Sequence, residues 1–467
     1  MVTLDFLEKL NNEYDKYFES VLTQKRFTHS YVKQLINDSK IQNNFSVKLL
    51  GRSIENREIY SIEFGVGEST VLLWSQMHGD EPTATMALFD IFNFLLADDE
   101  FNEIRNQIKK NLKLIFVPML NPDGAERITR QNAVGIDLNR DAKRLQSPES
   151  KILLNLVEEY QPVFGFNLHD QDFRWSVGNT NQLAAISLLA PVYDYEKSID
   201  SSRLNAIKLV AQLRRSFEKY LPNKIARYKD DYEPRSFGDL IAGKNISTIL
   251  IESGRDINDY NKFFYRKINF MMLLFSFTEI INNSYSEINI TEYFEIPTNG
   301  NFMVDLILRN VTYETQSEKA LIDIAINREE VYKENSRIPF FKSYIMDIGD
   351  LSVFYGIEEF DCTGFEFDLG LISDEELKSV SNLKESDLKK YHEKGILFLR
   401  TNQQTELNDL RMPINLITNQ NDSALEFNLN KPTNFVLKKN NEIKKIVLNG
   451  WLCDPDDLSK VKNGLVF

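Results

Sequence analysis

The chain of 467 residues contains little cysteine and no apolar run long enough to cross a membrane. Its two cysteines, Cys362 and Cys453, are too few for a disulfide framework and have no C-x-x-C spacing typical of a metal site. We expect two reduced, buried thiols, with one long-range bridge between them as the alternative. The most apolar stretch, residues 268–281, is interrupted by polar residues and is shorter than the ~20 residues of a membrane span. It therefore predicts a buried helix.

Positive charge is also scarce, since 55 Lys and Arg residues stand against 69 Asp and Glu residues and give a net charge of −14 at pH 7. A nucleic-acid partner or an anionic membrane would require a basic surface, so neither is an expected partner. The N-terminus has neither the basic region nor the apolar region of a signal peptide, so we expect a cytoplasmic protein unless a leader has been removed. The sequence does not indicate an oligomeric state.

The hydrophobic content of 42% is sufficient for packed cores, and the length favours two domains. Between residues 45 and 285, short apolar runs alternate with helical periodicity, which predicts an α/β domain with a doubly wound mixed sheet. Residues 1–44 show helical spacing and are expected to pack on this domain. Residues 286–467 show strand-like alternation, an Asn440-Asn441 hairpin signal and one helical stretch at 375–394, so we predict a smaller, mostly β domain.

The stretch 71–82, VLLWSQMHGDEP, combines a structural signal with reactive side chains. Its apolar beginning is typical of a strand buried on both faces, and Pro82 suits the first turn of a helix. His78 and Glu81 would then lie at the carboxyl end of a strand, where α/β sheets bind ligands. An imidazole and a carboxylate at this spacing can bind one Zn²⁺ ion. The alternative is a carboxylate favoured by the helix dipole beside an incidental histidine.

Two further apolar runs end in reactive side chains: His169 follows residues 163–168, and Glu252 follows residues 248–251. His169 is a candidate second metal ligand, with a hydrogen-bonded core histidine as the alternative. A carboxylate at the end of a buried strand costs free energy unless it is paired or used. Glu252 is therefore a candidate general base near a metal-bound water, with a salt bridge to an arginine as the alternative. The other two histidines, His29 and His392, lie in polar helical contexts and receive no role.

The segment 121–141 is expected to be a long polar loop that begins with turn residues and carries Arg127, Arg130 and Arg140. Guanidinium groups suit carboxylates and developing oxyanions. A solvated basic loop is the alternative, but a polar loop between buried strands is a common location for functional residues.

In chain order, the motifs H-x-x-E, N-P-D-G, R-x-N, G-x-D-L-N-R, N-L-H and I-E-x-G resemble those of the zinc carboxypeptidases, the carboxypeptidase A-like metallopeptidases. The resemblance covers roughly residues 45–284 and includes the early turn G-x-S-x-E-x-R at 51–57. It implies that the α/β domain has the fold of this family.

The resemblance further implies one Zn²⁺ ion per chain, held by His78, Glu81 and His169 with a water in the open position. Three protein ligands plus a water is also the general arrangement of catalytic zinc. By the same resemblance, Glu252 would activate that water and later pass the proton to the leaving amine. Arg130 would polarise the scissile carbonyl and stabilise the oxyanion.

For the substrate, the resemblance implies a peptide or acyl-amino acid whose free carboxylate is bound by Asn139 and Arg140. The family also has a mobile tyrosine before the general base. Tyr232 fits this position best, with Tyr228 as its rival.

Two departures from the family pattern bear on the activity. Asp80 stands where the digestive members carry Arg, and Asp141 replaces the usual Asn after the N-R pair. With the short R-x-N loop, this version is more similar to bacterial murein-peptide amidases of the same family. No residue stands out as a determinant of side-chain preference.

Three hypotheses about function follow. The leading one is a zinc metallocarboxypeptidase that hydrolyses the bond next to a free C-terminal carboxylate. The second is a zinc amidase or deacylase acting on murein peptides or N-acyl amino acids. The third is an inactive peptide-binding relative.

Overall fold

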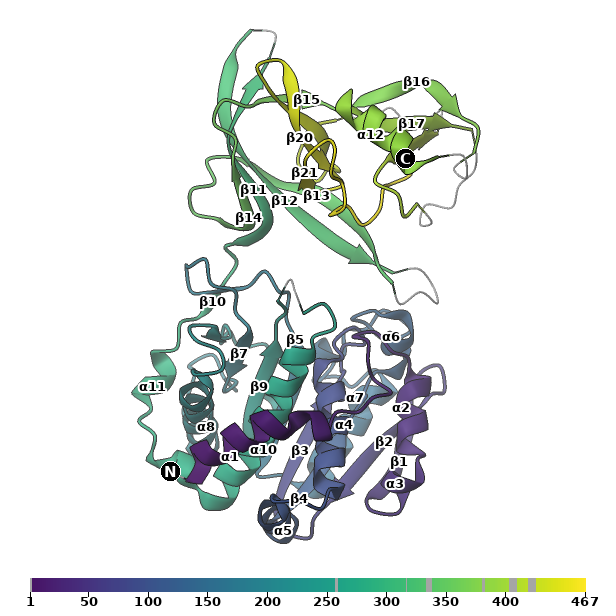
Figure 1. Ribbon diagram of the computed structural model, residues 1–467. Helices are drawn as coiled ribbons and strands as arrows, with labels where there is room; N and C mark the ends of the chain where they lie inside the picture. Colours follow the sequence, from purple (N-terminus) through teal and green to yellow (C-terminus); the bar gives the residue numbers. More distant parts are fainter. Residues whose placement is uncertain are drawn as a thin grey trace. The chain divides into compact units, whose positions relative to one another are not determined.

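The computed structural model describes residues 2–256, 259–315, 317–332, 338–379, 383–402, 410–418 and 426–467. They form two compact units, Met1–Asn301 (unit 1) and Phe302–Phe467 (unit 2) (Figure 1). Residues 286–301, which the sequence pattern assigned to the second domain, are part of unit 1, because Ile288, Tyr293 and Ile296 are buried in its core.

Unit 1 is built on a mixed eight-stranded sheet with the order β1-β2-β4-β3-β5-β9-β7-β8. Its strands are β1 (Ser46–Arg52), β2 (Glu58–Phe64), β3 (Ser69–Ser75), β4 (Leu112–Val117), β5 (Phe164–Asp170), β7 (Ile186–Leu189), β8 (Ile225–Arg227) and β9 (Ser247–Ser253). A separate two-stranded sheet joins β6 (Ser176–Val177) to β10 (Asn299–Gly300). Four central strands, β4, β3, β5 and β9, run parallel, and β2 and β7 are attached to them in antiparallel fashion. The predicted mixed α/β sheet is confirmed.

Helices cover both faces of this sheet. They are α1 (Val2–Glu13), α2 (His29–Ile36), α3 (Ser39–Gln42), α4 (Thr83–Leu96), α5 (Asn102–Asn111), α6 (Pro122–Arg127), α7 (Pro148–Tyr160), α8 (Ser201–Phe217), α9 (Phe237–Ala242), α10 (Phe263–Asn282) and α11 (Thr291–Phe294), with short 3-10 helices at Tyr14–Lys16, Leu138–Arg140 and Ser284–Glu287. Val71 and Leu73 of β3 belong to a core shared with α1, α4, α8 and α10, whereas Leu72 and Trp74 belong to a second core with α7 and α9. The apolar run at 71–74 is therefore buried on both faces, as predicted.

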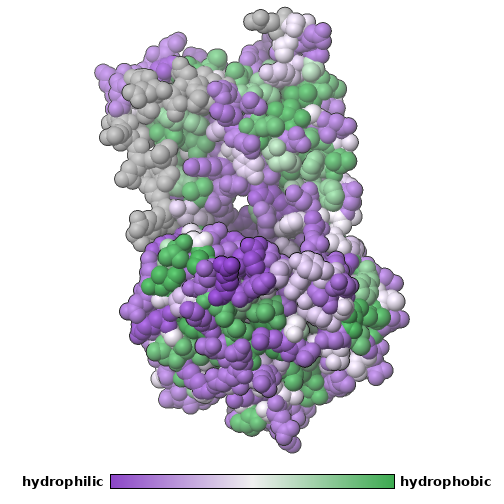
Figure 2. All heavy atoms as spheres, turned by 180° about the vertical axis from the view of Figure 1, so that it is seen from behind, coloured by the Kyte–Doolittle hydropathy of each residue, from purple (hydrophilic) through white to green (hydrophobic). Residues whose placement is uncertain are grey.

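The structure bears on the predictions for residues 268–281 and for the segment that begins at Asn121. The stretch 268–281 lies within α10, whose side chains are mostly buried, and no helix in the described part of the chain has the length and apolarity of a membrane span. The expected turn at Asn121 is instead the start of α6: Asn121 caps this helix through its side chain, and Pro122 occupies the first turn. Polar and apolar side chains are interspersed on the faces that Figure 2 shows, as is usual for folded proteins.

Unit 2 is mostly β, as predicted. Its larger sheet has the order β13-β12-β11-β15-β19-β20-β21 with β14 paired to β11, and a smaller one has the order β16-β17-β18. The elements are β11 (Met303–Glu314), β12 (Lys319–Val331), β13 (Phe340–Gly349), β14 (Tyr355–Asp361), β15 (Glu366–Leu369), β16 (Leu371–Leu377), α12 (Glu385–Glu393), β17 (Ile396–Thr401), β18 (Asn415–Thr418), β19 (Asn434–Lys439), β20 (Glu442–Leu448) and β21 (Trp451–Cys453).

The sequence signals in unit 2 gave mixed results. The Asn440-Asn441 hairpin is confirmed, since both residues have positive φ (55° and 60°) between β19 and β20. The helix expected at 375–394 is shorter: its first residues belong to strand β16, residues 380–382 lie outside the described part, and only α12 is helical. Both cysteines are free and buried, which confirms the expectation of reduced thiols.

Candidate metal centre and active site

The candidate site lies at the carboxyl ends of three neighbouring parallel strands, β3, β5 and β9. His78 follows β3, His169 is near the end of β5, and Glu252 is near the end of β9. His169 and Glu252 are direct neighbours in the β5–β9 register. Parallel strands end at the same edge of a sheet, so residues separated by 91 and 83 positions in the chain meet there (169 − 78 and 252 − 169).

Three of the predicted residues form a compact group of possible metal ligands. The Nδ1 atoms of His78 and His169 are 3.1 Å apart, and each lies 2.7 Å from a different carboxylate oxygen of Glu81. All three side chains are buried. The edge of a tetrahedron around Zn²⁺ is roughly 3.3 Å for Zn–N bonds of about 2.0–2.1 Å. The donor set and its spacing therefore fit a zinc ion.

The turn that carries His78 is fixed by close packing against α6. A Cβ atom on Gly79 would lie 2.0 Å from the carbonyl carbon of Gly124, so only glycine fits. The side chain of Asn121 donates to the carbonyl of Met77 (3.2 Å), and that of Gln76 donates to the carbonyl of Gly79 (2.8 Å). The N-P-D-G motif thus holds the first ligand in place.

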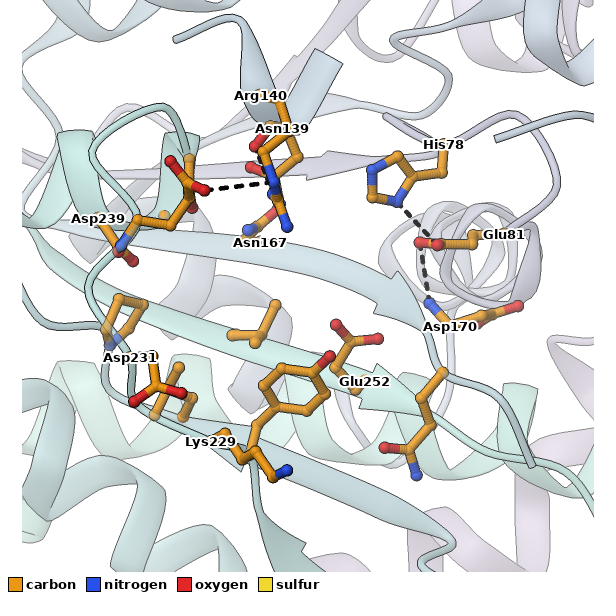
Figure 3. A pocket seen from close by; sticks show the side chains of 18 of the residues that line it. His78, Glu81, Asn139, Arg140, Asn167, Asp170, Lys229, Asp231, Asp239 and Glu252 are labelled. Atoms are coloured by element: carbon orange, nitrogen blue, oxygen red, sulfur yellow. Dashed lines mark hydrogen bonds and ion pairs between the residues drawn. The ribbon is translucent and has the colours of Figure 1, made fainter. Parts of the chain in front are cut away.

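Two aspartates support the ligand group from outside. The Oδ1 atom of Asp137 lies 3.1 Å from Nε2 of His78, and the backbone N–H of Asp170 donates to Glu81 (3.2 Å; Figure 3). Burial disfavours protonation of His78, but the carboxylates of Glu81 and Asp137 raise its pKa to about 9. A carboxylate on the distal nitrogen of a ligating histidine orients the ring and raises its basicity. Asp137 is the aspartate of the G-x-D-L-N-R motif, but its role beside His78 was not predicted from the sequence.

The candidate general base, Glu252, has the environment that its chemistry requires. Among the described residues, it forms no ion pair with an arginine or a lysine, so the salt-bridge alternative is not supported. Burial and the negative charge of Glu81 raise the pKa of Glu252. A carboxylate with a raised pKa beside a metal site is suited to accepting and returning a proton.

Glu252 lines a cavity of about 320 Å³ together with Arg130, Asn139 and Arg140 (Figure 3). An Nη1 atom of Arg130 lies 3.2 Å from Glu81, and its Nε donates to Asp137 (3.0 Å). This contact places the guanidinium directly beside the ligand group.

Asn139 and Arg140 are positioned from the other side of the cavity. The side-chain oxygen of Asn139 accepts from the backbone N–H of Phe237 at the start of α9 (2.9 Å). Nε of Arg140 lies 3.6 Å from Glu233, and its Nη1 donates to the carbonyl of Asn139 (2.7 Å). The Arg140 side chain is 40% exposed, so it is available to a ligand carboxylate.

The two tyrosines under consideration lie in different places. Tyr228 lines the cavity with Glu252, and burial raises its pKa well above the usual value by disfavouring the phenolate, so it stays protonated at neutral pH. Tyr232 is not among the described residues that line the cavity and packs edge-to-face against Tyr195 with ring centroids 4.9 Å apart. The described lining of the cavity thus includes Tyr228 but not Tyr232, and the choice of Tyr232 as the family's mobile tyrosine stays a prediction.

The remaining sequence candidates have structural roles. Arg127 pairs with Glu55 rather than lining the cavity. Asp141 is buried and accepts hydrogen bonds from the backbone N–H groups of Gln146 and Ser147 (2.8 and 2.9 Å), so it organises the start of α7. This role is a local structural reason for an aspartate at position 141, where the family usually has Asn.

The other two histidines are buried, although the sequence analysis placed them in polar contexts. His29 contacts the carbonyl of Glu58 (2.9 Å), and His392 is fully buried in unit 2. Asp80, where the family's digestive members carry Arg, is half-buried, and its backbone carbonyl accepts from Arg26. It is not among the described residues that line the cavity.

Comparison with known proteins agrees with this geometry. Residues 30–242 match the model of the zinc carboxypeptidase family. Mouse carboxypeptidase D is 28% identical over 170 residues, which cover 32% of this chain and 11% of that protein, and the human protein is 29% identical over the same length. Carboxypeptidase SOL1 of Arabidopsis thaliana is 25% identical over 169 residues and 34% of its length. The chain thus spans only a small part of the relatives it matches.

Two solved structures of carboxypeptidases align with part of this chain at low identity. The metallo-carboxypeptidase of Burkholderia cenocepacia aligns with a TM-score of 0.44 at 16% identity over 56% of this chain and 70% of that one. Carboxypeptidase A of Helicoverpa armigera aligns with a TM-score of 0.43 at 14% identity over 56% and 74%. The family match over residues 30–242, the curated relatives and the ligand group together support assignment of this part of the chain to the zinc carboxypeptidase family.

Proposed function

We propose that this protein is a zinc-dependent metallocarboxypeptidase that hydrolyses the amide bond next to a free C-terminal carboxylate. The observation that carries the proposal is the convergence of a buried His-Glu-His group, a carboxylate with a raised pKa and two arginines on one cavity. The terminal carboxylate and the developing oxyanion of the substrate would each face a guanidinium group.

The residues of the chain have separate roles in the proposed reaction. The guanidinium of Arg140 and the amide of Asn139 bind the terminal carboxylate, which aligns the last amide bond of the substrate with the ligand group. Arg130 donates hydrogen bonds to the carbonyl oxygen as it becomes negatively charged. Zinc, when bound to His78, Glu81 and His169, polarises the carbonyl and lowers the pKa of a water molecule.

Glu252 carries the proton. Its carboxylate takes a proton from the water whose oxygen bonds to the carbonyl carbon, and returns it to the amide nitrogen as the C–N bond breaks. Tyr228 lines the same cavity, and in this proposal its hydroxyl group donates a hydrogen bond to the substrate. The products are a shortened peptide and a free amino acid.

The second hypothesis, an amidase of murein peptides or a deacylase of N-acyl amino acids, uses the same chemistry. Asp80 suggested it, but the described lining of the cavity does not include Asp80. The geometry therefore gives no specific support to this alternative.

The test is hydrolysis of N-acylated dipeptides by the zinc-loaded protein. Removing zinc with a chelator should abolish hydrolysis, and adding zinc back should restore it. Glu252→Gln should lower kcat by roughly 10²- to 10⁴-fold while the zinc content stays unchanged. Glu158→Gln, an exposed site on α7, is the matched control and should retain full activity. Full activity of Glu252→Gln, or of the metal-free protein, would contradict the proposal, and activity confined to γ-linked peptides would favour the amidase.

A further inference from the structure

Asp170 directly follows the candidate ligand His169, and its backbone is bonded to a second candidate ligand, Glu81. The N–H of Asp170 donates to a carboxylate oxygen of Glu81 (3.2 Å; Figure 3), so the position of Asp170 affects where that oxygen lies. The side-chain Oδ2 of Asp170 accepts from the hydroxyl group of Thr83 in the first turn of α4 (2.8 Å). The ligand group does not include this side chain, and the proposed chemistry gives it no role.

The same oxygen of Asp170 is paired with Lys262, which lies 92 positions further along the chain (262 − 170). The Nζ atom of Lys262 is 2.9 Å from Oδ2, and the side chains of Lys262 and Asp170 are 10% and 7% exposed. In the described part of the chain, Asp170 forms no other ion pair. Separating a buried pair leaves an uncompensated charge away from water, so the pair fixes the position of both side chains.

Lys262 also contacts the strand that carries the candidate general base. Its Nζ donates to the carbonyl of Ser253 (3.3 Å), the residue after Glu252. The hydroxyl group of Ser253 in turn accepts from the amide of Asn269 in α10 (2.8 Å). Asp170 and Ser253 are neighbours in the β5–β9 register. One ammonium group therefore joins the two strand ends that carry a candidate metal ligand and the general base.

The backbone of Lys262 has a conformation that is unusual for lysine. Lys262 directly precedes α10 with φ +60° and ψ +28°, in the left-handed region. Glycine and asparagine adopt this region at lower cost than lysine does. The contacts of the ammonium group, rather than the backbone, therefore account for a lysine at this position. Because α10 is mostly buried, its start is a fixed point from which a side chain can hold the strand ends.

We infer that Lys262 is a positioning residue for the metal ligands and for the general base. The inference rests on the proposed function and adds a residue that acts on it from outside the cavity. Lys262 holds Asp170, whose N–H orients the carboxylate of Glu81, and it holds the carbonyl next to Glu252. Hydrogen bonds to ligating carboxylates contribute to metal affinity. Loss of the ammonium group should therefore weaken zinc binding and misplace the general base.

The test measures the zinc affinity of the metal-free protein with a competing chelator. Lys262→Asn suits the left-handed backbone, but its side chain is too short to reach Asp170. Loss of an outer partner typically costs 10- to 100-fold in metal affinity, and we expect about tenfold because Lys262 acts through Asp170. Lys197→Asn is the matched control, since Lys197 also has a positive φ (56°) and an ion pair of 2.9 Å, but with Asp230. Its zinc affinity should be unchanged.

Hydrolysis and a double-mutant cycle provide further readouts. In Lys262→Asn, kcat should fall by at least about tenfold, because a misplacement of about 1 Å can cost 10²-fold. KM should change by less than about threefold, since Asn139 and Arg140 are held by Phe237 and Glu233 instead. In the Asp170→Asn background, Lys262→Asn should cause little further loss of zinc affinity, because the two side chains act as a pair.

The zinc measurement separates this inference from the proposed function. If Lys262→Asn lowers zinc affinity but the wild type hydrolyses no peptide, the proposed function fails and the positioning role holds. Zinc affinity within about twofold of wild type in Lys262→Asn, or additive losses in the double variant, would overturn the inference. If Lys262→Asn does not fold, Lys262→Gln, which removes the charge and keeps most of the side chain, is judged by the same limits.

Discussion

Unit 1 has buried polar atoms without partners at its cavity, whereas in unit 2 several buried asparagines join neighbouring segments of chain. In unit 1, side-chain atoms of Asn167, His169 and Asp170 are buried without a partner. In unit 2, the amide of Asn415 donates to Asn434 (2.8 Å), and the amide of Asn449 donates to the carbonyl of Phe341 (2.8 Å). Polar groups left without partners at a cavity are available to a ligand, while those bonded to each other stabilise the fold.

The sheet topologies explain this difference. Parallel strands in unit 1 all end at one edge, so polar residues from distant parts of the sequence converge there. In unit 2, the pairings of β11–β12, β12–β13 and β19–β20 are antiparallel, so the ends of these strands alternate between opposite edges, whereas β11–β14 and the small β16-β17-β18 sheet are parallel. The experiments below test this contrast in order of decreasing effect.

Zinc binding should depend on His78 and His169 of unit 1 and be independent of His392 in unit 2. Loss of an outer partner of a ligand typically costs 10- to 100-fold in metal affinity, so replacing the ligand itself in His169→Gln should cost more than about 100-fold. His392→Gln should retain one zinc per chain. Zinc titration and elemental analysis of both variants measure this. A normal zinc content in His169→Gln would contradict the assignment of the ligand group.

Stability should depend on the asparagines of unit 2. Asn449→Ala removes the amide that accepts from the N–H of Ser343 (3.0 Å) and donates to Phe341, and it places alanine at φ +46°. The free energy of unfolding should fall by about 2–4 kcal/mol, with kcat unchanged at low temperature. Urea denaturation measures the change. Asn106→Ala, at an exposed position in α5, is the control and should change stability by less than about 0.5 kcal/mol.

Acid should destabilise unit 2 through His392. Burial lowers the pKa of His392 from 6.5 to about 4, so the unfolded chain binds a proton at a higher pH than the folded chain does. Stability from this residue is complete above pH 6.5 and is lost as the pH falls from 6.5 towards 4. At pH 5.5 the loss should be about 1 kcal/mol. Comparison of urea unfolding of wild type and His392→Gln at pH 7.5 and 5.5 isolates this contribution, and an identical pH dependence of the two proteins would exclude it.

Much of the fold could be predicted from local sequence patterns. The apolar run at 71–74 identified a strand buried on both faces, and Asn440-Asn441 identified a hairpin, because each signal depends on neighbouring residues alone. The helix at 375–394 was predicted too long, since the first part of that stretch pairs with β17 as strand β16. Pairing between distant segments overrides local helical spacing.

The sequence predicted the metal ligands and the general base of the candidate site but not the residues that support them. His78, Glu81, His169 and Glu252 could be named because they follow apolar runs in a recognisable order of motifs. The role of Asp137 could not, and Tyr228 could be named only as the rival of Tyr232, because both depend on contacts between distant segments of the chain. Tyr232, four residues further along the chain than Tyr228, was the better match to the pattern.

The sequence by itself determined the α/β class of the first unit, the mostly β second region and the identity of the candidate ligands and base, because periodicity and residue type are local properties. Only the tertiary structure decided that the described lining of the cavity includes Tyr228 but not Tyr232, that Asp137 supports His78, and that Lys262 pairs with Asp170. These outcomes depend on distances between segments far apart in the chain, and those distances are fixed by strand register and helix packing.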